Sequence, residues 1–109
     1  MLVEVMTFEG CPHAAPAVAL ARRVADEAGV SADVRVVDVA DAETERRRFL
    51  GSPSIRVAGR DVEPGAELRR DYAHGCRLYA TSAGRSALPD EAWVRDALLA
   101  VPKPSRLRE

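Results

Sequence analysis

The strongest constraint on the fold lies near the N-terminus, where an apolar run leads through Gly10-Cys11-Pro12 into a helical pattern. Residues 2–8 are mostly apolar and β-branched, as expected of a buried strand. From about Pro12 to Ala28, apolar residues recur at helical spacing, and Gly29 is a typical helix stop. Cys11 is thereby expected between a strand and a helix start, where unpaired N–H groups and the helix dipole favour the reactive thiolate.

The composition narrows the class of protein and its expected surroundings. A chain of 109 residues is expected to form one domain, which we place at residues 1–104, followed by a flexible tail at 105–109. The net charge of −1 gives no reason to expect a nucleic acid or a membrane surface as partner. No run approaches the roughly 20 apolar residues of a membrane span. No signal peptide is recognisable, so we expect a cytoplasmic protein with free, catalytic or metal-binding cysteines.

The middle of the chain is predicted to form a strand, a helix and a further strand. Residues 33–39 alternate and are β-branched, which is typical of a strand. Asp41 can cap a helix that extends to about Leu50. The run Arg46-Arg47-Arg48 invites a phosphate-binding interpretation, but acidic residues three and four positions earlier favour ion pairs on a solvated face. Residues 54–57, which follow a proline and precede a glycine turn, are predicted as the third strand.

The C-terminal half is predicted to contain a hairpin and a last helix. Residues 61–75 lack periodicity and are expected to form a surface excursion. Residues 76–79 are predicted as a fourth strand, and the turn-rich residues 81–85 as part of a hairpin. A last helix is expected from Pro89-Asp90-Glu91 until Pro102 and Pro104, with Trp93 in the core. The predicted order is therefore β-α-β-α-β-β-α, an α/β protein.

Two of these landmarks resemble the thioredoxin-like superfamily, including its glutaredoxin-like members. They are Gly10-Cys11-Pro12-His13 at the first strand–helix junction, and Gly51-Ser52-Pro53 immediately before the third strand. The resemblance implies a central mixed four-stranded sheet flanked by helices. It also implies that Pro53 is cis and faces Cys11, while the Ser52 backbone aligns an extended partner segment. The chain departs from the family at Ala14, where a dithiol enzyme has its second cysteine.

The first interpretation of these residues is thiol–disulfide exchange. Cys11 would be the nucleophile, activated by the helix start at Pro12 and by a protonated His13. The substrate would be a protein or small-molecule disulfide, with Pro12, Ser52 and Pro53 in the substrate-binding surface. The mixed disulfide would be resolved by a low-molecular-weight thiol as co-substrate, with no other cofactor, or by Cys76. A disulfide needs Cα atoms within about 7 Å, and Cys76 can equally be an inert buried residue.

Two other interpretations remain open. Cys11-Pro12-His13 and His74-Gly75-Cys76 mirror each other, and four such ligands can bind zinc, Cu(I) or a mercury species. Alternatively, the chain is a binding module of this fold without redox turnover. His13 in the first turn can equally be exposed and passive, and we expect His74 at the surface. We predict the thiol–disulfide chemistry.

Overall fold

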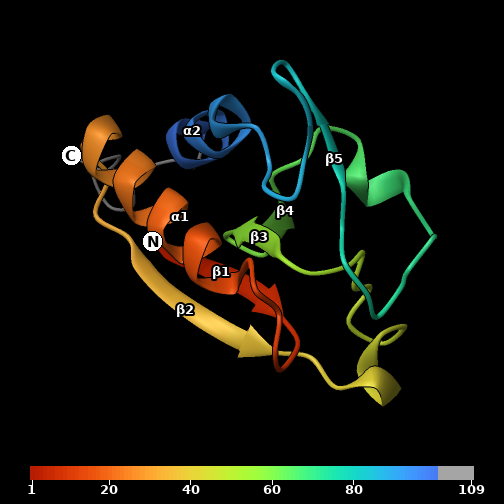
Figure 1. The fold of residues 1–109 in the computed structure, drawn as a ribbon. Helices are drawn as coiled ribbons and strands as arrows, with labels where there is room; N and C mark the ends of the chain where they lie inside the picture. The colour runs from red at the N-terminus through yellow and green to blue at the C-terminus, as the bar shows by residue number, and fades with distance from the viewer. Residues whose placement is uncertain (101–109) are drawn as a thin grey trace.

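The computed structural model describes residues 1–100, which form a mixed α/β protein around a four-stranded mixed sheet (Figure 1). The strand order is β2-β1-β3-β4, in which β1 and β2 are parallel, whereas β3 is antiparallel to both β1 and β4. These strands are β1 (Leu2–Thr7), β2 (Asp33–Asp38), β3 (Ser54–Val57) and β4 (Arg60–Asp61). A separate hairpin consists of β5 (Tyr79–Thr81) and β6 (Gly84–Ser86).

Helices α1 (Ala14–Ala28) and α2 (Glu91–Ala100) pack against each other and against one face of the sheet. Both contribute to the main core, together with alternate residues of β1 and β3, and Trp93 lies at its edge, partly buried. Pro16 does not break α1. It is the third residue of the helix, so the N–H that it lacks is one of the four that have no partner within the helix.

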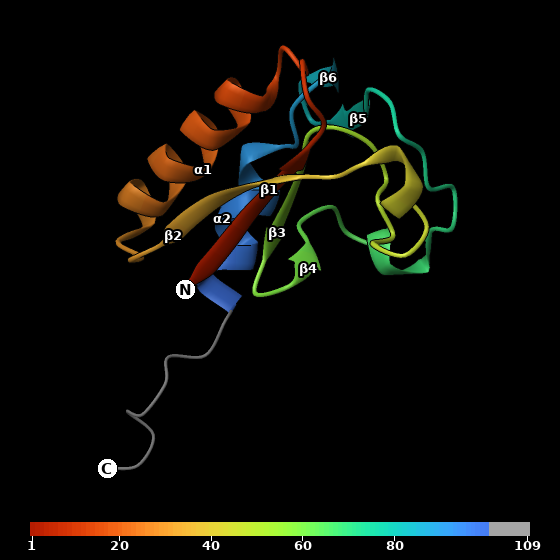
Figure 2. The same cartoon turned by 90° about the horizontal axis from the view of Figure 1, so that it is seen from below.

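The opposite face of the sheet carries a smaller apolar cluster of Met6, Val39 and Phe49. Irregular segments, residues 39–50 and 62–78, lie on the side away from α1 (Figures 1 and 2). The predicted helix at 41–50 is wrong: the chain forms only a 3-10 helix, η1 (Asp41–Glu43), and then turns. Apart from Ala42, the apolar residues of this segment are the adjacent Phe49 and Leu50. They cannot form the stripe that a helix needs to pack.

The fourth strand of the sheet is not at 76–79, where we predicted it. The turn through Ala58 and Gly59, both at positive φ, folds Arg60–Asp61 back antiparallel to β3. The segment before β5 does not join this sheet as a strand, and its backbone forms an isolated parallel bridge between Ser52 and Cys76. The predicted hairpin is present, but it pairs Tyr79 with Ser86 in its own two-stranded sheet.

Helix α2 extends to Ala100, at the end of the described residues. Pro102 and Pro104, which we expected to end this helix, and the predicted tail at 105–109 lie outside the described residues. Within residues 1–100, no helix has the length and the apolar character needed to cross a membrane.

Candidate functional site

Cys11 lies in the turn that connects β1 to α1, and it is half-buried. Its N–H donates to the carbonyl of Phe8 at 3.2 Å, and its own carbonyl accepts from the N–H of Ala14 at 3.4 Å. We predicted that the helix starts at Pro12, but α1 begins at Ala14. His13 occupies the N-cap position instead and makes no side-chain capping hydrogen bond. The thiol is therefore positioned by a tight turn directly ahead of the helix.

The pKa of the Cys11 thiol lies below its ordinary value as the balance of opposing effects. Burial is the largest effect and raises the pKa, because it disfavours the charged thiolate. Hydrogen bonds to the sulfur lower it more in total, with the Ser52 hydroxyl first, then the His13 N–H, the Thr7 hydroxyl and the Ala14 N–H. The thiolate is stabilised by donors at the strand end and at the helix start together.

Two buried hydroxyl groups contribute to the Cys11 site. Thr7 Oγ1 and Ser52 Oγ are hydrogen-bonded at 2.7 Å, and both residues are almost completely buried. The Ser52–Pro53 peptide bond is cis, the geometry that the family resemblance implies. Our sequence analysis missed Thr7, although it is the only hydroxyl-bearing residue of β1 and precedes Cys11 by four positions.

The backbone of Ser52 is paired with the segment that contains Cys76. The Ser52 N–H donates to the Gly75 carbonyl at 2.8 Å, and the Arg77 N–H donates to the Ser52 carbonyl at 2.9 Å. Residues that face each other in a bridge direct their side chains to the same side of the ladder. Cys76 therefore lies on the same side of the ladder as the Ser52 hydroxyl. Cys76 is a free, exposed thiol, so the alternative expectation that it is buried is wrong.

Gly51 allows this segment to approach the strand. A Cβ at Gly51 would lie 3.0 Å from the Arg77 Cβ and 3.1 Å from the Gly75 carbonyl oxygen, and the φ of +117° also disfavours any other residue. Residues 75–77 are thus in close backbone contact with the Gly51-Ser52 turn. The side that we expected Ser52 to offer to a partner is occupied by this chain's own residues.

The buried side chain of Arg77 holds residues 75–77 in place, and we did not identify this residue from the sequence. Its side chain is 1% exposed. Nη1 donates to Ser54 Oγ and to Asp61 Oδ2, both at 2.7 Å, and Nη2 donates to Asp61 Oδ1 at 3.2 Å and to Glu63 Oε1 at 2.5 Å. The guanidinium also lies 4.4 Å from the centroid of the Tyr79 ring, whose hydroxyl donates to the Pro53 carbonyl. One buried arginine thus connects the Cys76 segment to β3, β4 and Pro53.

The two histidines do not assemble with the cysteines into a metal site. His74 Nε2 lies 2.8 Å from the Val39 carbonyl oxygen, and its ring packs 5.0 Å from that of Phe8 and 6.1 Å from that of Phe49, centroid to centroid. We expected His74 at the surface, but it is half-buried. Within residues 1–100, no group of three or more His, Cys, Asp or Glu side chains is arranged to hold a metal ion.

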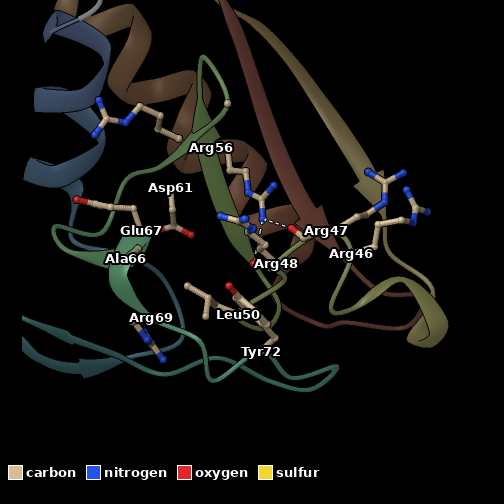
Figure 3. A pocket seen from close by; sticks show the side chains of 12 residues that line it. Arg46, Arg47, Arg48, Leu50, Arg56, Asp61, Ala66, Glu67, Arg69 and Tyr72 are labelled. Carbon is tan, nitrogen blue, oxygen red and sulfur yellow. Dashed lines mark hydrogen bonds between the residues drawn. The ribbon is translucent and has the colours of Figure 1, made fainter.

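A pocket of about 330 Å³ contains neither cysteine but is rich in arginine (Figure 3). The guanidinium groups of Arg46 and Arg47 point away from Arg56, and both lie near Glu43, at 2.6 and 3.4 Å. Arg56 donates to the Arg47 and Arg48 carbonyls at 2.7 and 3.2 Å. The prediction that acidic residues pair with the arginine run is confirmed for Arg46 and Arg47, although on a turn and not on a helix.

Comparison with known protein families, curated proteins and solved structures finds no match to this chain. Its class follows from its own fold and site. It is a mixed α/β protein with a thiol of lowered pKa at a strand–helix junction. A second free thiol, Cys76, lies on a segment whose backbone is hydrogen-bonded to Ser52, and the Ser52 hydroxyl lowers the pKa of Cys11.

Proposed function

We propose that this protein is a thioredoxin-like thiol–disulfide oxidoreductase in which Cys11 attacks and Cys76 resolves. The strand order, with β1 and β2 parallel and β3 and β4 antiparallel, is compatible with that family, as is the cysteine at the first strand–helix junction. The observation that carries the proposal is the bridge between Ser52 and Cys76. It brings a second thiol next to the residue whose hydroxyl stabilises the Cys11 thiolate.

The first step is the attack of the Cys11 thiolate on a disulfide, RS–SR. A bond forms between the Cys11 sulfur and one sulfur of the substrate, and the other sulfur leaves as RS⁻, which takes a proton from water. Ser52, Thr7 and the N–H groups of His13 and Ala14 hold the thiolate available for this attack. The lowered pKa increases the thiolate fraction at neutral pH, which is the fraction that reacts.

The second step replaces the cysteine that the chain lacks at position 14. The deprotonated Cys76 sulfur attacks the Cys11 sulfur of the mixed disulfide, forms a Cys11–Cys76 disulfide and releases the second RS⁻. The substrate has gained two electrons and the protein dithiol has lost them. Two molecules of a low-molecular-weight thiol of a reducing cytoplasm then reduce the protein disulfide in two exchanges, leave joined as their own disulfide, and complete the cycle.

Mass spectrometry after stoichiometric oxidation with glutathione disulfide tests this mechanism. We expect the wild-type protein to lose two hydrogens without retaining an adduct. Cys76→Ser should retain one glutathione on Cys11, because no second thiol is present to displace it. Cys11→Ser serves as the control for the reactivity of an exposed thiol, because only Cys76 remains.

Two results would contradict the proposal. A stable glutathione adduct on Cys11 in the wild-type protein would show that Cys76 does not resolve it. A Cys11 that reacts no faster than an ordinary free thiol would instead leave a binding module without redox turnover as the better account. The two outcomes are distinguished by the site and the rate of adduct formation.

A further inference from the structure

We propose that residues 75–77 fill the peptide-docking edge beside Cys11, so that the site reacts with small disulfides and excludes disulfides in extended peptides. This inference rests on the proposed thiol chemistry and adds the class of substrate. The segment forms the main-chain contacts that an incoming strand would otherwise make, and its own cysteine, Cys76, lies at the position facing Ser52.

The first step is that a peptide that docks beside Cys11 needs main-chain groups that are not already hydrogen-bonded. A peptide that docks as an extended strand gains affinity through hydrogen bonds to exposed backbone N–H and C=O groups. At Ser52, whose hydroxyl lowers the pKa of the Cys11 thiol, the N–H is bonded to the Gly75 carbonyl at 2.8 Å and the C=O to the Arg77 N–H at 2.9 Å. An extended peptide therefore finds both groups already paired.

The second step is that the segment is held firmly. Gly51 lies so close to this segment that an added Cβ would come within 3.0 Å of the Arg77 Cβ and 3.1 Å of the Gly75 carbonyl oxygen. Lifting the segment would also pull Arg77 away from Ser54, Asp61 and Glu63, to which its buried side chain donates. Separating one member of a buried ionic network is strongly unfavourable, because a charge is left without its partner. A peptide has to overcome this cost before it can form its own hydrogen bonds.

The third step is that the side of Cys11 formed by its own turn is exposed. Glu9, Gly10 and Pro12, which surround Cys11 in the turn, are exposed, and Cys11 itself is half-buried. A small disulfide can approach along this side and place its two sulfurs in line with the thiolate, with no need for a main-chain partner. Access at the site is therefore limited by the size and shape of the substrate.

Competing substrates of different size test the inference in a Cys76→Ser background, where only the Cys11 attack is measured. The small probe is bis(2-hydroxyethyl) disulfide. The large probe is a nine-residue extended peptide whose central cysteine carries a mercaptoethanol disulfide. Each rate constant is divided by that of free 2-mercaptoethanol thiolate with the same probe, which removes the intrinsic reactivity of the probe.

We expect the normalised rate for the peptide to be at least about tenfold lower than that for the small probe, because two main-chain hydrogen bonds must break first. Two variants should raise the peptide rate toward that of the small probe. Arg77→Met removes the guanidinium that holds the segment in place. Gly51→Ala introduces a Cβ that comes too close to residues 75–77, while the guanidinium of Arg77 is retained. Arg22→Met, an exposed arginine on α1, is the matched control and should leave the ratio unchanged.

The outcomes separate this inference from the proposed function. A peptide that reacts as fast as the small probe in the Cys76→Ser protein would overturn the closed edge and leave the chemistry of Cys11 intact. Variants that leave the ratio unchanged, although their segment has become accessible to hydrogen exchange, would overturn it as well. A Cys11 thiol that reacts with neither probe faster than the reference thiolate would overturn the proposed function together with the inference.

Discussion

Replacing Arg77 by methionine tests whether one buried side chain holds the Cys76 segment in place. Methionine retains most of the apolar stem of the arginine, but it removes the guanidinium together with its hydrogen bonds and its contact with the Tyr79 ring. Asp61, which is 12% exposed, then loses both of its hydrogen bonds from Arg77. Glu63 retains Arg69 at 3.0 Å, so the largest part of the cost arises at Asp61.

The expected loss of stability follows from these contacts. Removing one partner of a buried ion pair costs about 3–5 kcal/mol when the other charge stays buried. Asp61 still accepts a hydrogen bond from the Glu63 N–H at 2.9 Å, and water reaches part of its side chain. We therefore expect the lower end of that range, about 3 kcal/mol. A domain of this kind has about 5–15 kcal/mol in total, so the variant should remain folded.

Urea unfolding followed by the fluorescence of Trp93, the single tryptophan, measures this loss. Arg23→Met is the matched control. Arg23 forms comparable pairs with Glu27 and Glu91 on the surface, where its side chain is 48% exposed, and its loss should cost less than about 1 kcal/mol. If Arg77→Met costs no more than Arg23→Met, the reasoning that Arg77 anchors the segment is refuted.

Three further changes have expected outcomes. Ser52→Ala should raise the pKa of Cys11, because the Ser52 hydroxyl is the largest of the effects that lower it, and Thr7→Val should raise the pKa less. The pH dependence of Cys11 alkylation measures both shifts. An equal or opposite order would contradict the leading role of Ser52. Burial raises the pKa of Tyr79, so folding favours the neutral phenol. Its contribution to stability is complete below the unfolded tyrosine pKa of about 10 and is lost at higher pH. Ultraviolet titration should show Tyr79 ionising only as the protein unfolds, and early ionisation in the native state would contradict this. Pro16→Ala should change the unfolding free energy by less than about 0.5 kcal/mol, because the N–H it restores has no helical partner; thermal unfolding would expose a larger effect.

Local patterns were sufficient to predict the elements whose packing follows from their own sequence. The apolar, β-branched run of β1, the apolar stripe of α1 and its stop at Gly29 all correspond to structure, with Gly29 in the left-handed conformation. The β3 strand was predicted with its observed bounds. The apolar residues of these segments are close together in the chain, so a local run or stripe is sufficient to indicate the element: β1 buries Val3 and Val5 on one face of the sheet and Met6 on the other.

Segments whose conformation depends on distant partners were not predictable in the same way. The segment 41–50 has good capping residues but no apolar stripe, and its structure is determined by where Phe49 can be buried. Strand β4 has only two residues, too few for any periodicity, and exists because of the turn at Gly59. Arg77 in sequence resembles any surface arginine, and only the fold brings Asp61 and Glu63 around it.

The same distinction governs the candidate site. The Cys11 half is local, because the strand, the turn and the helix start are contiguous in the chain. The Cys76 half is not: it reaches Ser52 at the end of the long excursion that follows β4, through one bridge that Gly51 permits and Arg77 secures. We propose on this basis that a chain with alanine at position 14 obtains its second thiol from its tertiary structure. In the mechanism proposed here, this makes the pairing of Cys11 with Cys76 depend on the stability of the Arg77 network. Any change that loosens this network should slow the formation of the disulfide more than the first attack by Cys11.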